Sequence, residues 1–457
     1  MNNNYSKLNP LNPDLDKSLQ YKKNLNFTDL FSAGYSFVIG AGIFILLPLI
    51  VKFSGGLSWL SFLIGCIICL FTGLSYSKLN MLFPTNDAEY AWILNVLNFD
   101  KSRDPDKVNV VVKSTANIIV WIIFFIGIFT SATILVCQAN FLKNYANINR
   151  IFLISILAAV PTFINIFGSK IATHFSKVVI LVITLLFGMV FKFGITDGKH
   201  FNELSTIGDK KYLFKNLLNS SFITLFLYNG FQSLVQLSEE AKSQKDIPKS
   251  LISSLLFSAL LYSLFGISVI ALLGVKLTSK SKMTLVDALK TVVSNDKVNL
   301  ANMVVIMILT NTVLIISLSR SRLLQKMAVR GIAPNIFKSL GKTTEKFDVN
   351  NNSKNTTNPI NAIIGVGIIT FLSTFIRDGA VETLTTLTNM FILISFFIVN
   401  ALVIVYHYKE KTVNESERLK FVDKEIPFLK GVPWYGFLGL IMSAIYLIKF
   451  PRIDTSL

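Results

Sequence analysis

The sequence predicts an all-α integral membrane protein with about eleven transmembrane helices. Hydrophobic residues make up 52% of the 457 residues and charged residues only 15%, whereas a soluble domain carries roughly 25% charged residues. Apolar runs of about twenty residues recur along the chain, and each is long enough to cross the hydrocarbon core of a bilayer as a helix. The predicted spans cover residues 30–51, 57–79, 116–142, 151–167, 171–193, 217–237, 251–275, 300–318, 360–376, 384–406 and 434–450.

The formal net charge of +18 arises from 44 Lys and Arg against 26 Asp and Glu. These charges lie between the apolar runs and do not alternate with aromatic residues along one face, so we expect loops of a membrane protein and no nucleic-acid partner. Lys and Arg are more frequent in the first tail and after the even-numbered spans, which places the N-terminus in the cytoplasm. Residues 1–28 form a polar tail without the pattern of a cleaved signal peptide.

Residue types that carry enzyme chemistry are sparse. Cys66 and Cys69 have CxxC spacing, but they lie inside an apolar run without a second Cys or His pair nearby, so they are expected to be small apolar helix residues. The sequence shows no nucleophile–base pair and no cluster of metal ligands. We therefore predict that the protein is not an enzyme, and that it needs no cofactor or metal.

Two spans contain residues that a continuous transmembrane helix would avoid. The first contains Gly40 and Gly42, and the sixth contains Asn229 and Gly230. Glycine lowers the free energy needed to leave helical geometry. Glycine also permits close helix packing, so packing remains an alternative explanation. A dinucleotide site is excluded, because Ile45 occupies the third glycine position of GxGxxG and no strand precedes the motif.

A break in each of these helices would expose helix ends inside the low-dielectric membrane. The start of a second half-helix presents free N–H groups and a partial positive charge, which suit a carboxylate. The end of a first half-helix presents free carbonyl groups, which suit an ammonium group. An α-amino acid carries both groups. Breaks at matching places in two halves of a transporter are the best sequence indication of a binding site.

Four stretches carry a family resemblance. They are Ile39-Gly40-Ala41-Gly42-Ile43-Phe44; Phe83-Pro84 through Glu89-Tyr90; Tyr228-Asn229-Gly230-Phe231 to Ser238-Glu239-Glu240-Ala241-Lys242 with Asp246-Ile247-Pro248-Lys249; and Ser321-Arg322 with Met327-Ala328, Gly331 and Pro334. Asn165-Ile166-Phe167-Gly168 and Asn358-Pro359-Ile360-Asn361 add weaker matches. In this order they resemble the signatures of the amino acid–polyamine–organocation (APC) superfamily of permeases, over roughly residues 30–450.

The resemblance implies a LeuT-type fold with broken first and sixth helices. A ten-helix transport core would occupy residues 29–407, as inverted five-helix repeats at about 29–193 and 216–407. A polar cytoplasmic tail (1–28) would precede it, and a cytoplasmic loop, helix 11 and a short tail (408–457) would follow.

The same resemblance implies where substrate binds. Its carboxylate would meet backbone N–H groups around Ala41, Gly42 and Ile43, and its ammonium group would meet carbonyls near Phe226 and Leu227. The candidate substrate-binding residues are Gly40, Ala41, Gly42, Ile43, Phe44, Phe226, Leu227, Tyr228, Asn229, Gly230 and Phe231, and the gating candidates are Phe226, Glu239, Glu240 and Arg322.

Several positions depart from the family pattern. Many members carry a Lys in helix 5 that stands in for sodium, but Ile183 or Thr184 falls there, which leaves proton, sodium and exchange coupling open. Arg330 replaces the Asp of the common Arg-Asp-Gly. Most members have twelve helices, and eleven are expected here. The loop at residues 143–150 has no Cys, so we expect no disulfide-linked glycoprotein subunit.

The leading hypothesis is therefore an amino acid permease or exchanger, a secondary transporter or antiporter that works by alternating access. It would act on a small-molecule amino acid substrate, in contact with membrane lipid, most simply in the plasma membrane. A polyamine or other amine transporter is an alternative in the same class. A permease-like amino acid sensor is an alternative in another class.

Overall fold

The structure is a computed structural model that describes residues 21–40, 42–97, 109–143, 149–206, 213–281, 284–345, 354–375, 380–411, 429 and 432–449. The elements of the first half are α1 (Phe27–Val38), α2 (Gly42–Ser54), η3 (Gly55–Leu57), α3 (Ser58–Leu82), α4 (Ala88–Leu97), α5 (Val110–Lys143), α6 (Arg150–Ile166), α7 (Ser169–Asp197) and η4 (Phe201–Ser205). Those of the second half are α8 (Leu213–Tyr228), η6 (Phe231–Glu240), α9 (Asp246–Thr278), α10 (Thr284–Lys290), α11 (Asn295–Val329), η7 (Asn335–Phe337), β1 (Gly341–Glu345), β2 (Lys354–Asn358), α12 (Ile360–Ser373), α13 (Ala380–Lys411) and α15 (Trp434–Lys449).

Every predicted span has a helical counterpart. Among the described residues, seven stretches are long and apolar enough to cross a membrane, and α6, α12 and α15 are shorter apolar helices. The sixth predicted span is divided between α8 and the 3₁₀ segment η6. Many large apolar side chains on the outside of the bundle are exposed, as lipid contact requires; examples are Ile118, Phe163, Leu185 and Met303.

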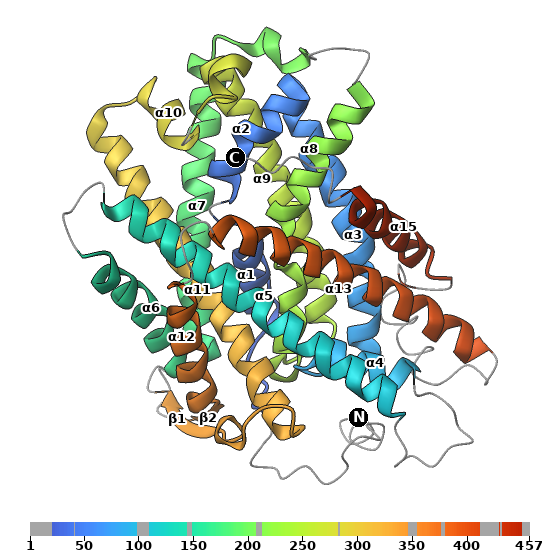
Figure 1. The fold of residues 1–457 in the computed structure, drawn as a ribbon. Helices are drawn as coiled ribbons and strands as arrows, with labels where there is room; N and C mark the ends of the chain where they lie inside the picture. The colour runs from blue at the N-terminus through green and yellow to red at the C-terminus, as the bar shows by residue number, and fades with distance from the viewer. Residues whose placement is uncertain are drawn as a thin grey trace.

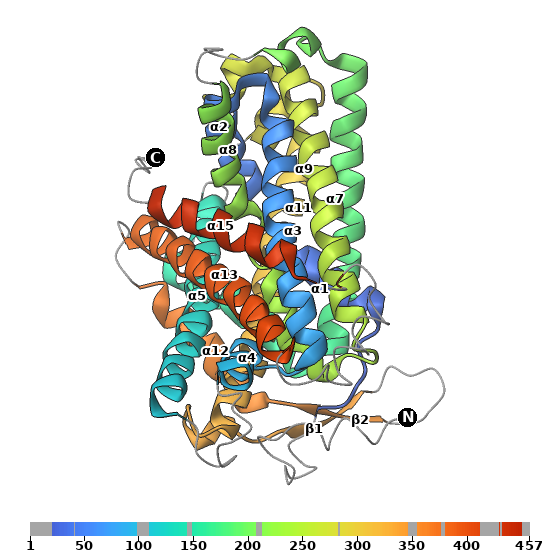
Figure 2. The same ribbon diagram turned by 90° about the vertical axis from the view of Figure 1, so that its right-hand side faces the viewer.

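The helices form two packed groups. In one group α9 packs against α1, α3 and α7, and α8 packs against α2 and α3. In the other group α11 packs against α5, α6 and α12. Figure 2 shows α3, α7 and α9 standing nearly upright, and Figure 1 shows α5 and α13 running obliquely across the molecule. The contacts of α11 with α7 and η6 join the two groups.

Each repeat opens with an interrupted helix, and the two interrupted helices run in opposite directions. The first half-helix α1 packs against η6, and the second half-helix α2 packs against α8. Because the first half of one interrupted helix lies beside the second half of the other, the two helices must run antiparallel. In Figure 1 α2 and α8 lie in the upper part of the molecule and α1 lies below them. This arrangement confirms the predicted five-plus-five inverted fold with broken helices 1 and 6.

The hairpin of β1 and β2 and the short helices α4 and α10 were not predicted. Gly341 pairs with Asn358 at one end of the antiparallel hairpin and Glu345 pairs with Lys354 at the other. The hairpin lies at the same end of the molecule as residues 21–26 (Figure 2). We call this end the N-terminal face.

Candidate functional site

The first helix is interrupted at the predicted glycine motif. Helix α1 ends at Val38, Ile39 adopts an extended conformation, and α2 begins at Gly42. Ala41, a predicted site residue, lies outside the described residues. The end of α1 therefore presents carbonyl groups, and the start of α2 presents N–H groups, near the middle of the bundle.

The sixth helix is interrupted at the second predicted motif. Helix α8 ends at Tyr228, and Gly230 follows with φ of 113°, a left-handed conformation that favours glycine. A Cβ at Gly230 would lie 2.6 Å from the carbonyl oxygen of Phe37, close to the end of α1. The two interruptions therefore lie against each other.

The second contact between the interruptions joins α2 to α8. A Cβ at Gly42 would lie 2.7 Å from Leu227 Cδ2 and 3.9 Å from Phe226 Cε1. Gly40, Gly42, Phe226, Asn229 and Gly230 are only partly buried, although most of their neighbours are fully buried. These residues come from both interruptions and keep some accessible surface inside the bundle.

At the start of η6, a side chain accepts a hydrogen bond from the first N–H group. The N–H of Gly230 donates to Gln232 Oε1 at 2.9 Å, and Gln232 Nε2 donates to Asn229 Oδ1 at 2.8 Å. A side chain that accepts from free N–H groups at a helix start reduces the capacity of that start to bind another anion. The start of η6 therefore has less capacity for a carboxylate.

Other predicted site residues serve packing. The hydroxyl group of Tyr228 donates to the carbonyl of Phe62 at 2.9 Å, and the ring of Phe231 lies 6.0 Å from that of Tyr76. Both Tyr228 and Phe231 are fully buried. Ile43 and Phe44 are also buried, and the Phe44 ring packs edge-on against Phe265.

Two side chains that sequence reasoning missed contact the interruptions from other helices. Tyr262 of α9 donates to the carbonyl of Val38 at 2.9 Å and lies 3.4 Å from that of Leu227. Thr312 of α11 lies 3.4 Å from the carbonyl of Ile39. Tyr262 thus contacts the carbonyl ends of both first half-helices, α1 and α8. No local sequence pattern identifies Tyr262 or Thr312 as a site residue, because each lies in the middle of its helix and far from the interruptions in the sequence.

The N-terminal face is closed by ion pairs that include three of the gating candidates. Arg322 Nε donates to Glu240 Oε1 at 2.7 Å, and both side chains are almost wholly buried. Glu239 pairs instead with Lys326 at 2.6 Å, and it also accepts from the hydroxyl of Thr85 at 3.0 Å. The structure thus brings Glu240 and Arg322 together but separates Glu239 from Arg322.

The two weaker sequence matches also meet at this face. Asn358 accepts a hydrogen bond from Arg322 Nη2 at 3.0 Å. Its own amide group donates to the carbonyls of Asn165 and Ile166 at 2.9 and 2.8 Å. The end of α6, the end of β2 and helix α11 are therefore fixed to one another.

Arg330, the departure from the family pattern, pairs with Asp87 in the loop before α4. Arg330 Nε lies 2.6 Å from Asp87 Oδ2. Burial alone would raise the pKa of Asp87, but the charge and hydrogen bonds of Arg330 outweigh burial and hold that pKa below its ordinary value. Asp87 thus stays ionised and joins the α3–α4 loop to the end of α11.

The segment before α1 crosses the same face. Leu25 forms a parallel bridge with Ala241, and the N–H of Lys242 donates to the carbonyl of Leu25 at 2.8 Å. The hydroxyl of Tyr21 donates to Gln325 Oε1 at 3.3 Å. Residues 21–26 therefore pair with the chain directly after η6.

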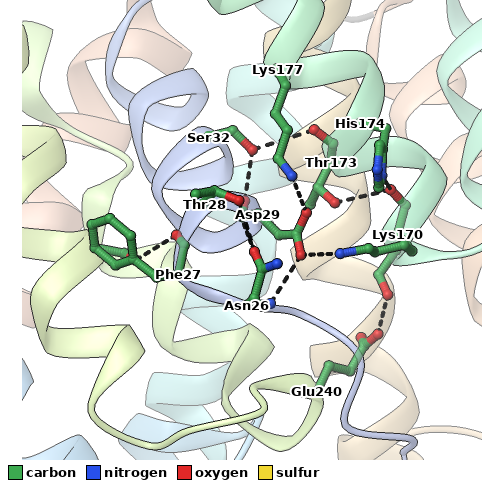
Figure 3. Close-up of polar contacts among 12 residues, drawn as sticks. Asn26, Phe27, Thr28, Asp29, Ser32, Lys170, Thr173, His174, Lys177 and Glu240 are labelled. Atoms are coloured by element: carbon green, nitrogen blue, oxygen red, sulfur yellow. Dashed lines mark hydrogen bonds and ion pairs between the residues drawn. The ribbon is translucent and has the colours of Figure 1, made fainter.

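A further ion-pair cluster joins α1 to α7. Figure 3 shows Lys170 and Lys177 of α7 reaching the carboxylate of Asp29, whose other neighbour is the capping residue Asn26. Lys177 Nζ lies 2.6 Å from Asp29 Oδ1, and Asp29 is fully buried. Because Asn26 and Asp29 also form a capping box, this cluster sets both where α1 begins and which helix it packs against.

Comparisons with known proteins agree with this architecture. Mhp1, a nucleobase-cation-symport-1 family transporter solved in a closed conformation with bromovinylhydantoin bound, has a similar fold, with a TM-score of 0.59 at 12% identity. The match covers 96% of this chain and 95% of that one. The molecule therefore has a fold similar to that of this membrane transporter.

The sequence comparisons define the family. The model of the amino acid permease family matches residues 25–454, so the chain belongs to the amino acid permease family. A mitochondrial cationic amino acid transporter of Arabidopsis thaliana is 23% identical over 415 residues, and a branched-chain amino acid permease of Bacillus subtilis is 24% identical over 274 residues. These matches cover 85% and 54% of this chain, and 63% and 54% of the relatives. The family consists of transporters and not enzymes.

Proposed function

We propose that this chain carries an amino acid across a membrane by alternating access, with the substrate held between the two helix interruptions. The observation that carries the proposal is the meeting of three helix ends of complementary charge. The start of α2 offers free N–H groups beside Gly42, and the ends of α1 and α8 offer carbonyl groups. A zwitterion needs both kinds of partner within a few ångströms of each other.

The side chains around the interruptions favour a neutral substrate. Phe226, Leu227 and Phe44 are apolar, and no described carboxylate contacts the interruptions to balance a cationic side chain. One relative is named for branched-chain amino acids and the other for cationic amino acids. Leucine is therefore the first substrate to test, and arginine is the second.

We assign the N-terminal face to the cytoplasm, because Lys and Arg concentrate in the segments on this side. The ion pairs at this face would then form the inner gate, and Phe226 would cover the bound substrate. We expect the plasma membrane as the location, although one relative is named as mitochondrial.

Counterflow in proteoliposomes tests the proposal. Vesicles loaded with unlabelled leucine should take up radiolabelled leucine, and Gly42→Trp should abolish this uptake because the indole would fill the space beside Leu227. Gly188→Trp is the matched control, because Gly188 on α7 has no atom within 4 Å of its Cβ position. Saturable binding of leucine without movement would favour a sensor. Absence of both leucine and arginine counterflow in folded protein would overturn the amino acid proposal.

A further inference from the structure

Glu89 differs from the other carboxylates near the N-terminal face in having no cation beside it. It lies in the first turn of α4 and is 1% exposed. Within the part of the chain that the structure describes, no basic side chain comes within ion-pair distance of it. The neighbouring carboxylates of Asp87, Glu239 and Glu240 each lie 2.6–2.7 Å from a Lys or Arg.

The hydrogen bonds of Glu89 leave half of its carboxyl group unsatisfied. Tyr76 donates to Glu89 Oε1 at 3.3 Å and lies 3.0 Å from the hydroxyl of Ser395. Glu89 Oε2 is buried without a partner. An ionised carboxylate in this position would lack most of the hydrogen bonds that stabilise its charge, whereas a protonated carboxyl group would be neutral.

Arg320 of α11 is the charged side chain that acts on Glu89 from a distance. Its guanidinium donates to Gln236 Oε1 at 3.0 Å and to Ser233 Oγ at 2.8 Å, both on η6. Arg320 Nε and Gln236 Nε2 are also buried without partners. Glu89 and Arg320 therefore belong to one buried polar cluster that extends from α4 to η6 and that contains one orphaned acceptor and two orphaned donors.

The groups around Glu89 favour its neutral form. Burial raises the pKa of Glu89 from its ordinary 4.5 to about 7, and the opposing effects of a hydrogen bond from its own backbone N–H, of Arg320 and of Tyr76 are smaller. Asp87 adds to the rise, because it is a second negative charge. Helices α13 and α5 pack against α4. Helix α13 contributes Ser395, and its Lys409 contacts the carbonyl of Val96 at the other end of α4. Helix α5 contributes Gly127 beside Arg320 and carries Lys113 in its first turn.

We propose that Glu89 is a proton-binding site of the transport cycle, which holds a proton while the cytoplasmic side is closed and releases it to the cytoplasm when that side opens. Opening must separate the α3–α4 loop from η6 and α11, because Thr85 contacts Glu239 and Asp87 pairs with Arg330. Water then reaches Glu89, which lies about one turn beyond Thr85. The carboxyl O–H bond breaks, its electrons remain on the carboxylate, and the proton passes to water.

The direction of the coupling follows from the difference in the pKa of Glu89 between the closed state and the open state. The closed state, with its raised pKa, binds the proton more tightly than a hydrated open state of ordinary pKa. Stabilisation of the closed state by the proton is fully present below about pH 4.5 and is lost as the pH rises through about 7. Proton release therefore accompanies inward opening. With uptake of the proton from the outer side while the cytoplasmic side is closed, each cycle carries a proton inward, and an inward proton gradient drives substrate accumulation. The inference depends on the proposed transport function.

The test measures leucine uptake in proteoliposomes with and without a proton gradient. At one-to-one coupling, each pH unit of external acidity supports about tenfold accumulation of a neutral substrate. We expect the wild type to accumulate leucine at least severalfold above the level without a gradient, and a protonophore to remove the excess. Glu89→Gln should lower the ratio of gradient-driven to gradient-free uptake to about one. Asp197→Asn is the matched control, because Asp197 is an exposed carboxylate at the end of α7, and it should retain the ratio of the wild type.

Two results separate this inference from the transport function itself. Leucine counterflow without any response of the wild type to the gradient would overturn the proton site and leave the transport function standing. A Glu89→Gln variant that responds like the wild type would also overturn it. Absence of both leucine and arginine counterflow in the folded wild type would overturn both.

Tyr76→Phe provides a variant that keeps the carboxyl group. Loss of the hydroxyl donor removes a hydrogen bond that favours the ionised form, so the pH at which uptake changes should move upward. An unchanged midpoint in folded Tyr76→Phe protein would argue against Glu89 as the titrating group.

Discussion

Arg322 and Glu240 form an ion pair with a 2.7 Å contact in which both side chains are almost wholly buried. Arg322 lies on α11 of the second repeat, and Glu240 is the last residue of η6. Ser169, at the start of α7, also donates to Glu240. One buried carboxylate thus joins three segments at the N-terminal face, so its loss should affect more than one helix contact.

Glu240→Gln should destabilise the protein by about 3–5 kcal/mol, because it leaves the guanidinium of Arg322 buried without a countercharge. Glu239→Gln is the matched control. Its pair with Lys326 is less deeply buried, with side-chain exposures of 11% and 18%, so its loss should cost less than the loss of Glu240. Thermal unfolding in detergent, followed by intrinsic fluorescence, compares the two variants. Equal shifts in Tm would contradict a special role for the buried pair.

Gly42→Ala should weaken substrate binding, because the new methyl group would lie 2.7 Å from Leu227 Cδ2. Overpacking of this kind costs about 1–3 kcal/mol, which corresponds to a rise of about fivefold to a hundredfold in KM. Gly188→Ala should leave KM unchanged, because its Cβ position is open. The measurement is the concentration dependence of leucine counterflow. A normal KM in Gly42→Ala would place the substrate elsewhere.

Gly230→Ala should be more damaging than Gly331→Ala, although both glycines have positive φ. Backbone strain alone costs roughly 1 kcal/mol, and Gly331→Ala should show only this cost because no atom lies within 4 Å of its Cβ position. Gly230→Ala adds a clash of 2.6 Å with the backbone carbonyl of Phe37, which cannot move without α1. Thermal unfolding of the two variants measures the difference. Similar Tm values would mean that the two interruptions do not touch.

Asp87→Asn should lower stability by an amount that grows as the pH falls from 8 to 6, because protonation of Glu89 removes its repulsion of Asp87, and that is then constant down to about pH 5. The pKa of Asp87 is held below its ordinary value, so the stabilisation is present above that value and is lost only as the pH falls through the lowered pKa. The difference in Tm between wild type and variant, measured across this range, checks the expectation. A difference that shrinks as pH falls from 8 to 6 would show that a group other than Glu89 titrates with the pair.

The interruptions could be predicted from the sequence because they are encoded locally. Gly40, Gly42 and Gly230 each mark a point where the backbone leaves helical geometry, and a short motif is enough to find them. Hydropathy also located every span, since lipid-facing helices must be apolar along their length.

The extent of α11 could not be predicted in this way. Its apolar run ends at residue 318, but the helix continues to Val329. Arg320, Arg322 and Lys326 lie in this extension and are buried, because partners from η6 and neighbouring segments satisfy their charges and hydrogen bonds. A hydropathy pattern counts each of these residues as a loop residue, since it contains no information about partners distant in the sequence.

The roles of Tyr262 and Thr312 were missed for a related reason. Each contacts a carbonyl group that becomes free only when another helix is interrupted. A Thr hydroxyl in the middle of a transmembrane helix normally bonds to its own helix backbone, and a Tyr hydroxyl can reach any neighbouring helix, so the sequence alone does not identify these partners.

The bridge between Leu25 and Ala241 links the two repeats directly, because it pairs the backbone before α1 with the backbone after η6. A short pair of backbone strands transmits displacement along its length, so residues 21–26 and the end of η6 should move together when either moves. A spectroscopic label on the exposed side chain of Lys23 would then report the position of the sixth helix as well as the first, from a site outside the transport path.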